Sequence, residues 1–151
     1  MFHNELHNIV KKFIDSPVYQ HIDLLSRKSF INEFCVLDMT LPRRVGKTTT
    51  ILNLCEMGDI IFTRNLCMMD NIGGELSKLD KGYPQIVVVA GCEFSANGEF
   101  ANDLRSTIRK YTTSSTVLWF DETDCLDFVK DYLIKETRIP IGFKLVSLQT
   151  R

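Results

Sequence analysis

The fold of this 151-residue chain is decided by the stretch Leu41-Pro42-Arg43-Arg44-Val45-Gly46-Lys47-Thr48-Thr49-Thr50. An apolar run, residues 34–39, comes before it and is typical of a buried strand. Residues 51–55 follow, and their apolar side chains suit one side of a helix. A strand, a tight loop ending in Gly-Lys-Thr and a helix are the context that a phosphate-binding loop needs. We therefore expect phosphate groups to bind at this loop.

The chemistry of such a loop comes from its backbone and from two side chains. Backbone N–H groups and the helix dipole bind phosphate oxygens. Lys47 would add positive charge at the terminal phosphates, and Thr48 would offer its hydroxyl to Mg²⁺. Leu41 stands where the usual pattern G-x-x-x-x-G-K-[ST] has its first Gly. The alternative is a basic turn between a strand and a helix, with Lys47 merely solvated.

A second stretch, residues 116–122, ends in two acids after an apolar run. This pattern predicts a buried strand that delivers carboxylates at its carboxyl end, the edge of a parallel sheet where ligands bind. Asp121 would hold the hydration shell of Mg²⁺, and Glu122 would orient and deprotonate an attacking water. The alternative is an acidic, solvated helix start, because Asp124 and Asp127 follow. The phosphate-loop stretch upstream favours the catalytic interpretation.

Composition indicates a globular protein with a single domain, residues 1–151. The chain is 44% apolar and 25% charged, and its net charge is −1, so no global basic signature for nucleic acid is present. It shows neither a signal-peptide pattern nor an apolar run of transmembrane length. The cysteines lack Cys-x-x-Cys spacing, which favours reduced, buried thiols over disulfides or zinc. They are Cys35, Cys55, Cys67, Cys92 and Cys125.

Periodicity predicts strands alternating with helices. Residues 1–33 form a helical lead-in whose first helix ends at Ser16-Pro17, and residues 65–80 are ambiguous because Gly73-Gly74 weakens a helix. Further helices are expected at 100–111 and 126–135. The expected strands are 34–39, 60–63, 86–90, 116–121 and 143–148. This alternation indicates an α/β fold of three layers with a mostly parallel central sheet of about five strands.

Residues 42–48 resemble the variant phosphate loop of the ATPase domain of viral DNA-packaging terminases, the large subunit of tailed phages and herpesviruses. The resemblance covers about residues 19–150 through short motifs. It implies a P-loop ATPase that binds ATP and Mg²⁺, with the strand at 143–148 inserted between those at 34–39 and 116–121. It assigns Arg43 as a cis-acting arginine near the γ-phosphate, and Glu122 as the catalytic acid. The implied nucleotide-binding residues are Gln20, Pro42, Arg43, Arg44, Val45, Gly46, Lys47, Thr48 and Thr49, and the implied Mg²⁺ residues are Thr48 and Asp121.

Two further motifs of the resemblance lie outside the loop and the acidic pair. Tyr19-Gln20 matches the upstream adenine-contacting pair, where an amide donates and accepts together. A polar residue at a helix start explains Gln20 equally well. The strand ending Ser147-Leu148-Gln149-Thr150 matches the family's coupling motif, which senses hydrolysis.

The resemblance also implies partners and a compartment. They are double-stranded DNA, further copies of the chain or other packaging proteins, in the reducing cytoplasm or nucleus of an infected host cell, with no membrane and no secretion. The nuclease domain of large terminases has no counterpart here, so DNA cutting is not implied. DNA affinity would depend on local cations, for which the candidates are Arg105, Arg109, Lys110, Arg138, Lys144 and Arg151.

Three other functions compete with a packaging ATPase. One is a nucleotide-binding interaction module with little or no hydrolysis. Another is a fragment of a helicase-like ATPase, which shares the Gln, loop and Asp-Glu features but needs a second motor domain. The third is a small-molecule kinase, against which Leu41 and the acidic pair argue. ATP turnover with and without DNA separates the packaging ATPase from the interaction module.

Overall fold

The computed structural model describes residues 3–17, 26–90 and 99–151. In these residues five parallel strands form one sheet in the order β1-β5-β4-β2-β3. The strands are β1 (Val36–Leu41), β2 (Ile60–Thr63), β3 (Val87–Val89), β4 (Val117–Asp121) and β5 (Lys144–Thr150). The α/β fold with a parallel sheet is therefore confirmed.

The last strand lies between two strands that come before it in the chain. β5 pairs with β1 on one side, where Leu41 faces Thr150, and with β4 on the other, where Asp121 faces Leu148. The inserted strand that the resemblance implied is therefore present. As a result the phosphate-loop strand and the acidic-pair strand are not direct neighbours.

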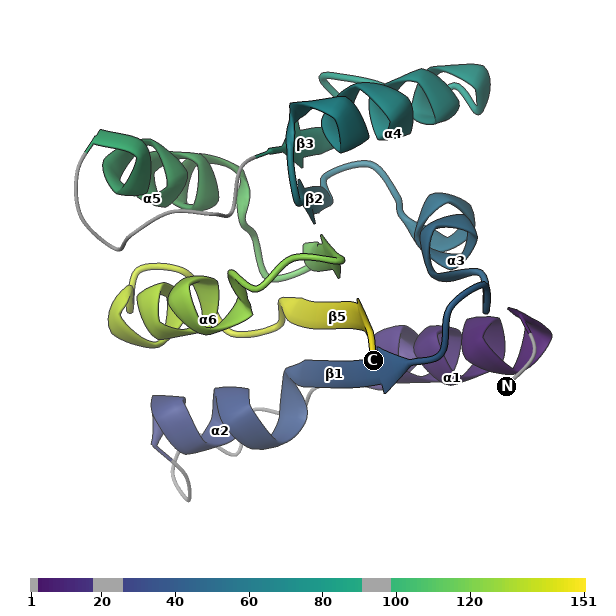
Figure 1. The fold of residues 1–151 in the computed structure, drawn as a ribbon. Coiled ribbons are helices and arrows are strands. Elements are labelled where there is room, and N and C mark those ends of the chain that lie inside the picture. The colour runs from purple at the N-terminus through teal and green to yellow at the C-terminus, as the bar shows by residue number, and fades with distance from the viewer. Residues whose placement is uncertain (1–2, 18–25, 91–98) are drawn as a thin grey trace.

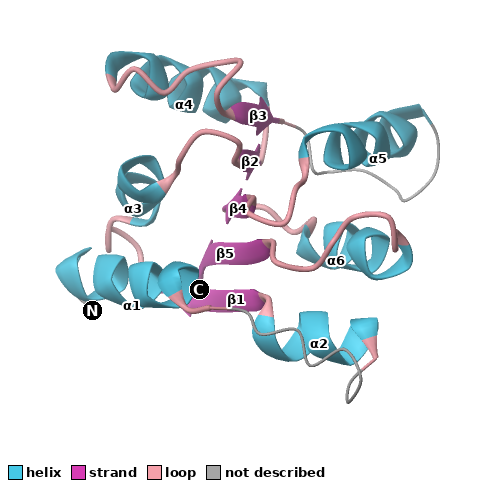
Figure 2. Cartoon of the chain, turned by 180° about the vertical axis from the view of Figure 1, so that it is seen from behind, coloured by secondary structure: helices cyan, strands magenta, loops and turns pink. Residues whose placement is uncertain are grey.

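Six helices among the described residues cover the two faces of the sheet (Figures 1 and 2). Figure 1 shows α1, α3 and α4 on one face and α2, α5 and α6 on the other, which makes three layers. The bounds of the helices are α1 (His3–Asp15), α2 (Arg27–Phe34), α3 (Lys47–Leu54), α4 (Leu66–Lys78), α5 (Glu99–Tyr111) and α6 (Leu126–Lys135).

Alternating side chains build a separate core on each face. In β4, Leu118 and Phe120 belong to the core under α2, α5 and α6, whereas Trp119 belongs to the core under α1, α3 and α4. The rings of Phe62 and Phe120, on neighbouring strands, stack with centroids 4.7 Å apart. Burial on both faces is why these strands are continuous apolar runs in the sequence.

Local capping explains where the element boundaries differ from the expected ones. Ser26 accepts a hydrogen bond from the backbone N–H of Ser29 and starts α2, which then runs to Phe34, so β1 begins at Val36. Asn65 caps α4 in the same way through the N–H of Met68. With this cap and a buried apolar side, α4 continues through Gly73-Gly74, which settles the ambiguous segment as a helix.

Three cations bind the carboxyl ends of helices. The Lys144 ammonium donates to the carbonyls of Phe13, Ile14 and Ser16 at the end of α1. Lys81 donates to the carbonyls of Leu52, Asn53 and Cys55 at the end of α3, and Arg27 to those of Leu133 and Glu136 at the end of α6. Positive charge is favourable there because the last carbonyls have no partner within the helix.

Lys144 is therefore not a DNA contact. The side chain was among the candidate cations for DNA, but it is 95% buried, since its exposed fraction is 5%. Its ammonium is already satisfied by three carbonyl oxygens of α1 and its following turn. The prediction was wrong because the sequence does not show that Lys144, the first residue of β5, faces the end of α1 instead of solvent.

The cysteines largely match the expected buried thiols. Cys35, Cys55 and Cys125 are buried thiols, while Cys67 is exposed and Cys92 lies outside the described residues. Burial raises the pKa of the Cys35 and Cys55 thiols to about 11. No helix in the described part of the chain is both long enough and apolar enough to cross a membrane.

Candidate nucleotide and magnesium site

The loop between β1 and α3 turns through two residues with left-handed backbone. Arg44 has φ of 61° and Gly46 has φ of 84°, a conformation that suits glycine and strains a residue with a Cβ. Leu41 is still part of β1 and its side chain is buried, which explains why no glycine is required there. The turn is made three residues later instead.

Helix α3 begins at Lys47, directly after the loop. Gly46 occupies its N-cap without a side-chain hydrogen bond to the first turn. The backbone N–H groups of that turn have no intrahelical partner and remain for a ligand. The sequence predicted that the helix would begin at residue 51. It begins at Lys47, so its first turn already contains the Lys-Thr-Thr segment.

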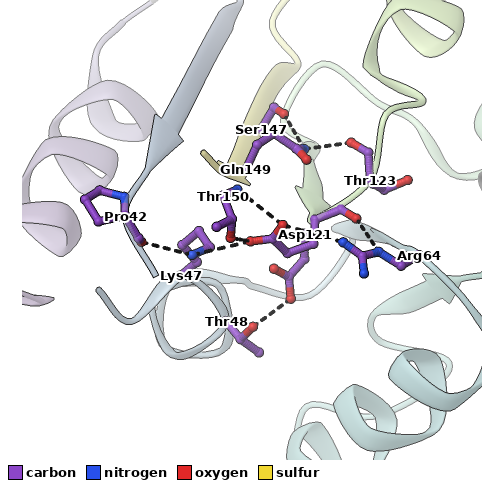
Figure 3. A network of polar contacts seen from close by, with 10 residues as sticks. Pro42, Lys47, Thr48, Arg64, Asp121, Thr123, Ser147, Gln149 and Thr150 are labelled. Carbon is purple, nitrogen blue, oxygen red and sulfur yellow. Dashed lines mark hydrogen bonds and ion pairs between the residues drawn. The ribbon is translucent and has the colours of Figure 1, made fainter. Parts of the chain in front are cut away.

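Lys47 lies against the acidic pair. Its side chain is 9% exposed, and its ammonium is 3.3 Å from Oε1 of Glu122 and 3.4 Å from the carbonyl oxygen of Pro42. The alternative of a solvated lysine in a basic turn is therefore not what the structure shows. The ammonium sits between the loop and the end of β4 (Figure 3).

Thr48 and Asp121 meet at the centre of the site. The Thr48 hydroxyl donates to Oδ2 of Asp121 at 2.8 Å. Oδ1 of Asp121 is buried and has no hydrogen-bond partner within the described residues. Burial raises the pKa of this carboxyl, and the neighbouring charge of Glu122 adds to the rise against the opposing bond from Thr48. Such a buried acceptor stabilises the fold only when a cation or a proton satisfies it.

Three hydrogen bonds to β5 hold Glu122. Its backbone is left-handed, with φ of 55°, and its N–H donates to the carbonyl of Leu148 at 3.1 Å. The Thr150 hydroxyl donates to Oε1, and the Thr150 N–H donates to Oε2 at 3.2 Å. Burial would raise the pKa of Glu122, but the Thr150 bonds and the Lys47 ammonium bring it below its ordinary value.

The end of β5 supports the loop that follows the acidic pair. The Gln149 amide donates to the Thr123 carbonyl at 2.6 Å and to the Ser147 hydroxyl at 3.0 Å. Figure 3 shows Ser147, Gln149 and Thr150 beside Thr123 and Asp121. The strand matched to a coupling motif thus contacts both the acid and the loop after it.

A pocket of about 390 Å³ opens between the loop, the acidic pair and the start of α4. Arg43 and Arg44 are exposed and line it together with Lys47, and Arg64 lines it from the end of β2. Four cations face one carboxylate, Glu122, in this lining, which suits an anionic ligand. The remaining lining residues are Asn65, Met68 and Thr150.

The residues present fit a Mg²⁺ ion bound together with phosphate. Mg²⁺ is usually held by one or two protein ligands, with waters and phosphate oxygens completing the octahedron. The Thr48 hydroxyl and the unsatisfied oxygen of Asp121 meet that requirement. No cluster of three or more His, Cys, Asp or Glu side chains that could hold a metal occurs in the described residues.

Most of the predicted site residues come together. Arg43, Arg44, Lys47 and Glu122 line the pocket, and Thr48 and Asp121 bond to each other. Pro42 and Gly46 belong to the loop, Thr49 is exposed on α3, and Val45 anchors the loop in the core with 6% exposure. Tyr19 and Gln20 lie outside the described residues, so the adenine contact stays a prediction.

Two contacts of the site were missed by the sequence analysis. Thr150 was named only as part of a motif, and Arg64 was not considered. Arg64 follows the strand 60–63, and the rule that ligands bind at the carboxyl ends of parallel strands could have found it.

Comparisons with protein-family models, curated proteins and solved structures gave no match. The interpretation of the site therefore depends on its geometry.

Proposed function

We propose that this protein is a Mg²⁺-dependent P-loop ATPase. The observation that supports it is the convergence of Lys47 and Thr48, from the loop and α3, on Asp121 and Glu122 at the end of β4. A phosphate loop beside two acids, one of them with a buried unsatisfied oxygen, suits binding and hydrolysis of a nucleoside triphosphate.

The chain's own residues supply most of the chemistry. The first turn of α3 and the Lys47 ammonium bind phosphate oxygens, which draws Lys47 away from Glu122. The Glu122 carboxylate then accepts the proton of the attacking water on Oε1 or Oε2. Arg43 stabilises negative charge as it builds on the γ-phosphate. Mg²⁺, held by Thr48 and Asp121, would neutralise charge on the phosphates.

The wider role is proposed from the resemblance of the loop to packaging terminases. The protein would be a motor of that kind, with double-stranded DNA, further copies of itself or other packaging proteins as partners, in a reducing compartment of an infected host cell. A second candidate is a nucleotide-binding interaction module with little turnover. It is favoured by one observation: both carboxylate oxygens of Glu122 already accept hydrogen bonds from Thr150, which lowers the pKa of the acid and weakens it as a base.

The test is ATP hydrolysis by purified protein over a concentration series, with and without double-stranded DNA. Lys47→Ala should weaken binding of Mg²⁺-ATP sharply. Glu122→Gln should keep ATP bound and lower turnover by about 10²–10⁴-fold, because an amide cannot accept the proton. Lys78→Ala and Glu75→Gln are matched controls, since this exposed pair lies on α4 outside the pocket.

Each outcome distinguishes the candidates. Equal affinity for Mg²⁺-ATP in wild type and Lys47→Ala would show that the loop is not a phosphate-binding loop. A measurable wild-type rate that Glu122→Gln leaves intact would show that the catalytic assignment is wrong. Tight ATP binding without wild-type turnover would support the interaction module.

A further inference from the structure

Arg64 contacts the acid that the proposed reaction depends on. Its Nε–H donates to the backbone carbonyl oxygen of Glu122 at 3.4 Å, and its terminal NH2 group is 3.9 Å from Oε2 of the same residue. One guanidinium therefore reaches both the backbone and the carboxylate of Glu122. In Figure 3, Lys47 and Arg64 approach from opposite sides of the site.

The position of Arg64 is fixed by the sheet. β2 pairs with β4 so that Thr63 faces Asp121, which places the next residue on each strand, Arg64 and Glu122, side by side. Thr63 is buried and its hydroxyl bonds to the Val89 carbonyl, while Asn65 caps α4. The backbone of Arg64 is therefore held on both sides, although its side chain is 58% exposed.

Glu122 needs such support because its backbone conformation is strained. A left-handed residue with a Cβ, here with φ of 55°, persists when neighbours hold it. β5 holds the N–H of Glu122 through the Leu148 carbonyl, and Arg64 bonds to its carbonyl oxygen. The direction of the carboxylate follows from this turn.

The cations around Glu122 also change when phosphate binds. Within the described residues, Lys47 and Arg64 are the cations in ion-pair distance of its carboxylate. Phosphate oxygens compete for Lys47, which is the first residue of α3. Arg64 follows β2 and approaches Oε2 of Glu122, whereas Lys47 approaches Oε1. Arg64 therefore stays beside Glu122 when Lys47 moves.

We propose that Arg64 is a positioning residue for hydrolysis, which holds the turn and the carboxylate of Glu122 after Lys47 is drawn to the phosphates. This inference rests on the proposed ATPase function. It assigns to Arg64 an effect on the catalytic step and not on nucleotide affinity. A misplaced catalytic group can cost about 10²-fold in rate, so the effect is large enough to measure.

The experiment measures kcat, the KM for ATP and the Kd of Mg²⁺-ADP for wild type, Arg64→Ala and Arg64→Lys. Arg64→Ala should lower kcat by about 10–100-fold and leave KM and Kd within about twofold. Guanidinium ions at millimolar concentration should restore part of the rate, because the exposed site of the lost side chain is open to solvent. Arg64→Lys keeps the charge but not the fork, so its kcat should fall between the two.

Two further measurements separate a positioning role from a general loss of structure. The backbone ¹⁵N shift of Thr123 reports hydrogen bonding to the Glu122 carbonyl, and it should change in Arg64→Ala without any ligand. Lys78→Ala removes a cation from a 75%-exposed side chain on α4, outside the pocket, and should leave kcat unchanged.

The outcomes are distinct. A wild type without turnover refutes the proposed function and this inference with it. Wild-type turnover with unchanged kcat in Arg64→Ala refutes the inference alone. A raised KM or Kd with unchanged kcat makes Arg64 a phosphate-binding residue instead. A lower kcat with no guanidinium rescue and a lower melting temperature shows a merely structural role, which also overturns the inference.

Discussion

Asp121→Asn should stabilise the ligand-free protein while removing its response to Mg²⁺. Asp121 is 1% exposed, and one of its carboxylate oxygens has no partner in the described residues. Burial raises its pKa, which means that the folded protein disfavours the charged form. An asparagine keeps an acceptor for the Thr48 hydroxyl and removes the buried charge.

The size of the effect follows from these contacts. A buried polar atom without a partner costs about 1–3 kcal/mol, and more when the group is charged. Asparagine still leaves one polar atom unsatisfied, so only the charge-related part is regained, about 1 kcal/mol. For a chain of this length, that corresponds to a rise in Tm of about 2–4 °C.

The pH dependence has a definite sign. Because the folded pKa of Asp121 is raised, its contribution to stability is fully present below the unfolded pKa and is lost as the pH rises through the folded value. The variant has no such group. The stability gain of Asp121→Asn over wild type should therefore be greatest near pH 8 and shrink toward acid.

Thermal unfolding followed by circular dichroism at pH 8 and pH 5 provides the assay. Adding Mg²⁺ with ADP should raise the wild-type Tm more than that of the variant. The difference in Tm between the two proteins should therefore shrink or change sign. A ligand-free variant that melts below wild type at pH 8 would refute the reasoning about the buried charge. An equal Mg²⁺-ADP response in both proteins would refute the metal assignment.

Three other predictions concern charge. Arg43→Ala should lower ATP turnover by about 10³-fold and weaken ATP binding less, with Arg44→Ala as the neighbour expected to matter less; equal losses in rate and affinity would contradict the assignment. Lys144→Met should lower the unfolding free energy by about 2–4 kcal/mol in urea titrations, because three carbonyls lose a charged donor. Lys11→Met, at an exposed position of α1, should change it by less than about 0.5 kcal/mol. DNA affinity, measured by fluorescence anisotropy, should fall steeply as the salt concentration rises. The remaining candidate contacts to DNA phosphates are Arg105, Arg109, Lys110, Arg138 and Arg151. No binding at low salt would remove DNA as a direct partner.

The layered fold was predictable from its central strands. The run 116–121 has no alternation, and every residue of β4 is buried, as in a covered parallel sheet. The edge strands β1 and β3 are only partly buried, although both were predicted to be buried strands. Even the position of β5 between β1 and β4 was foreseen, from the resemblance. Element ends were less predictable, because they depend on caps such as Ser26 and on the pairing of Leu41 with Thr150.

The site was predictable where sequence neighbours act together. Lys47 and Thr48 follow one glycine, and Asp121 and Glu122 end one strand, so local pattern placed both pairs. Arg64 and Thr150 act through contacts between strands, and no local pattern marks such a partner. Lys144 shows the opposite error, since a basic residue at a strand start was assigned to solvent although α1 covers it.

The place of β5 in the sheet has a consequence for synthesis of the chain on the ribosome. β5 bonds to β1 and to β4, yet residues 144–150 are made after the other four strands that the structure describes. Until they emerge, β1 and β4 each keep an open edge toward the missing strand, and such edges pair readily with other chains. A nascent chain stalled before residue 144 would therefore leave these two strand edges open for a chaperone or a second nascent chain to occupy.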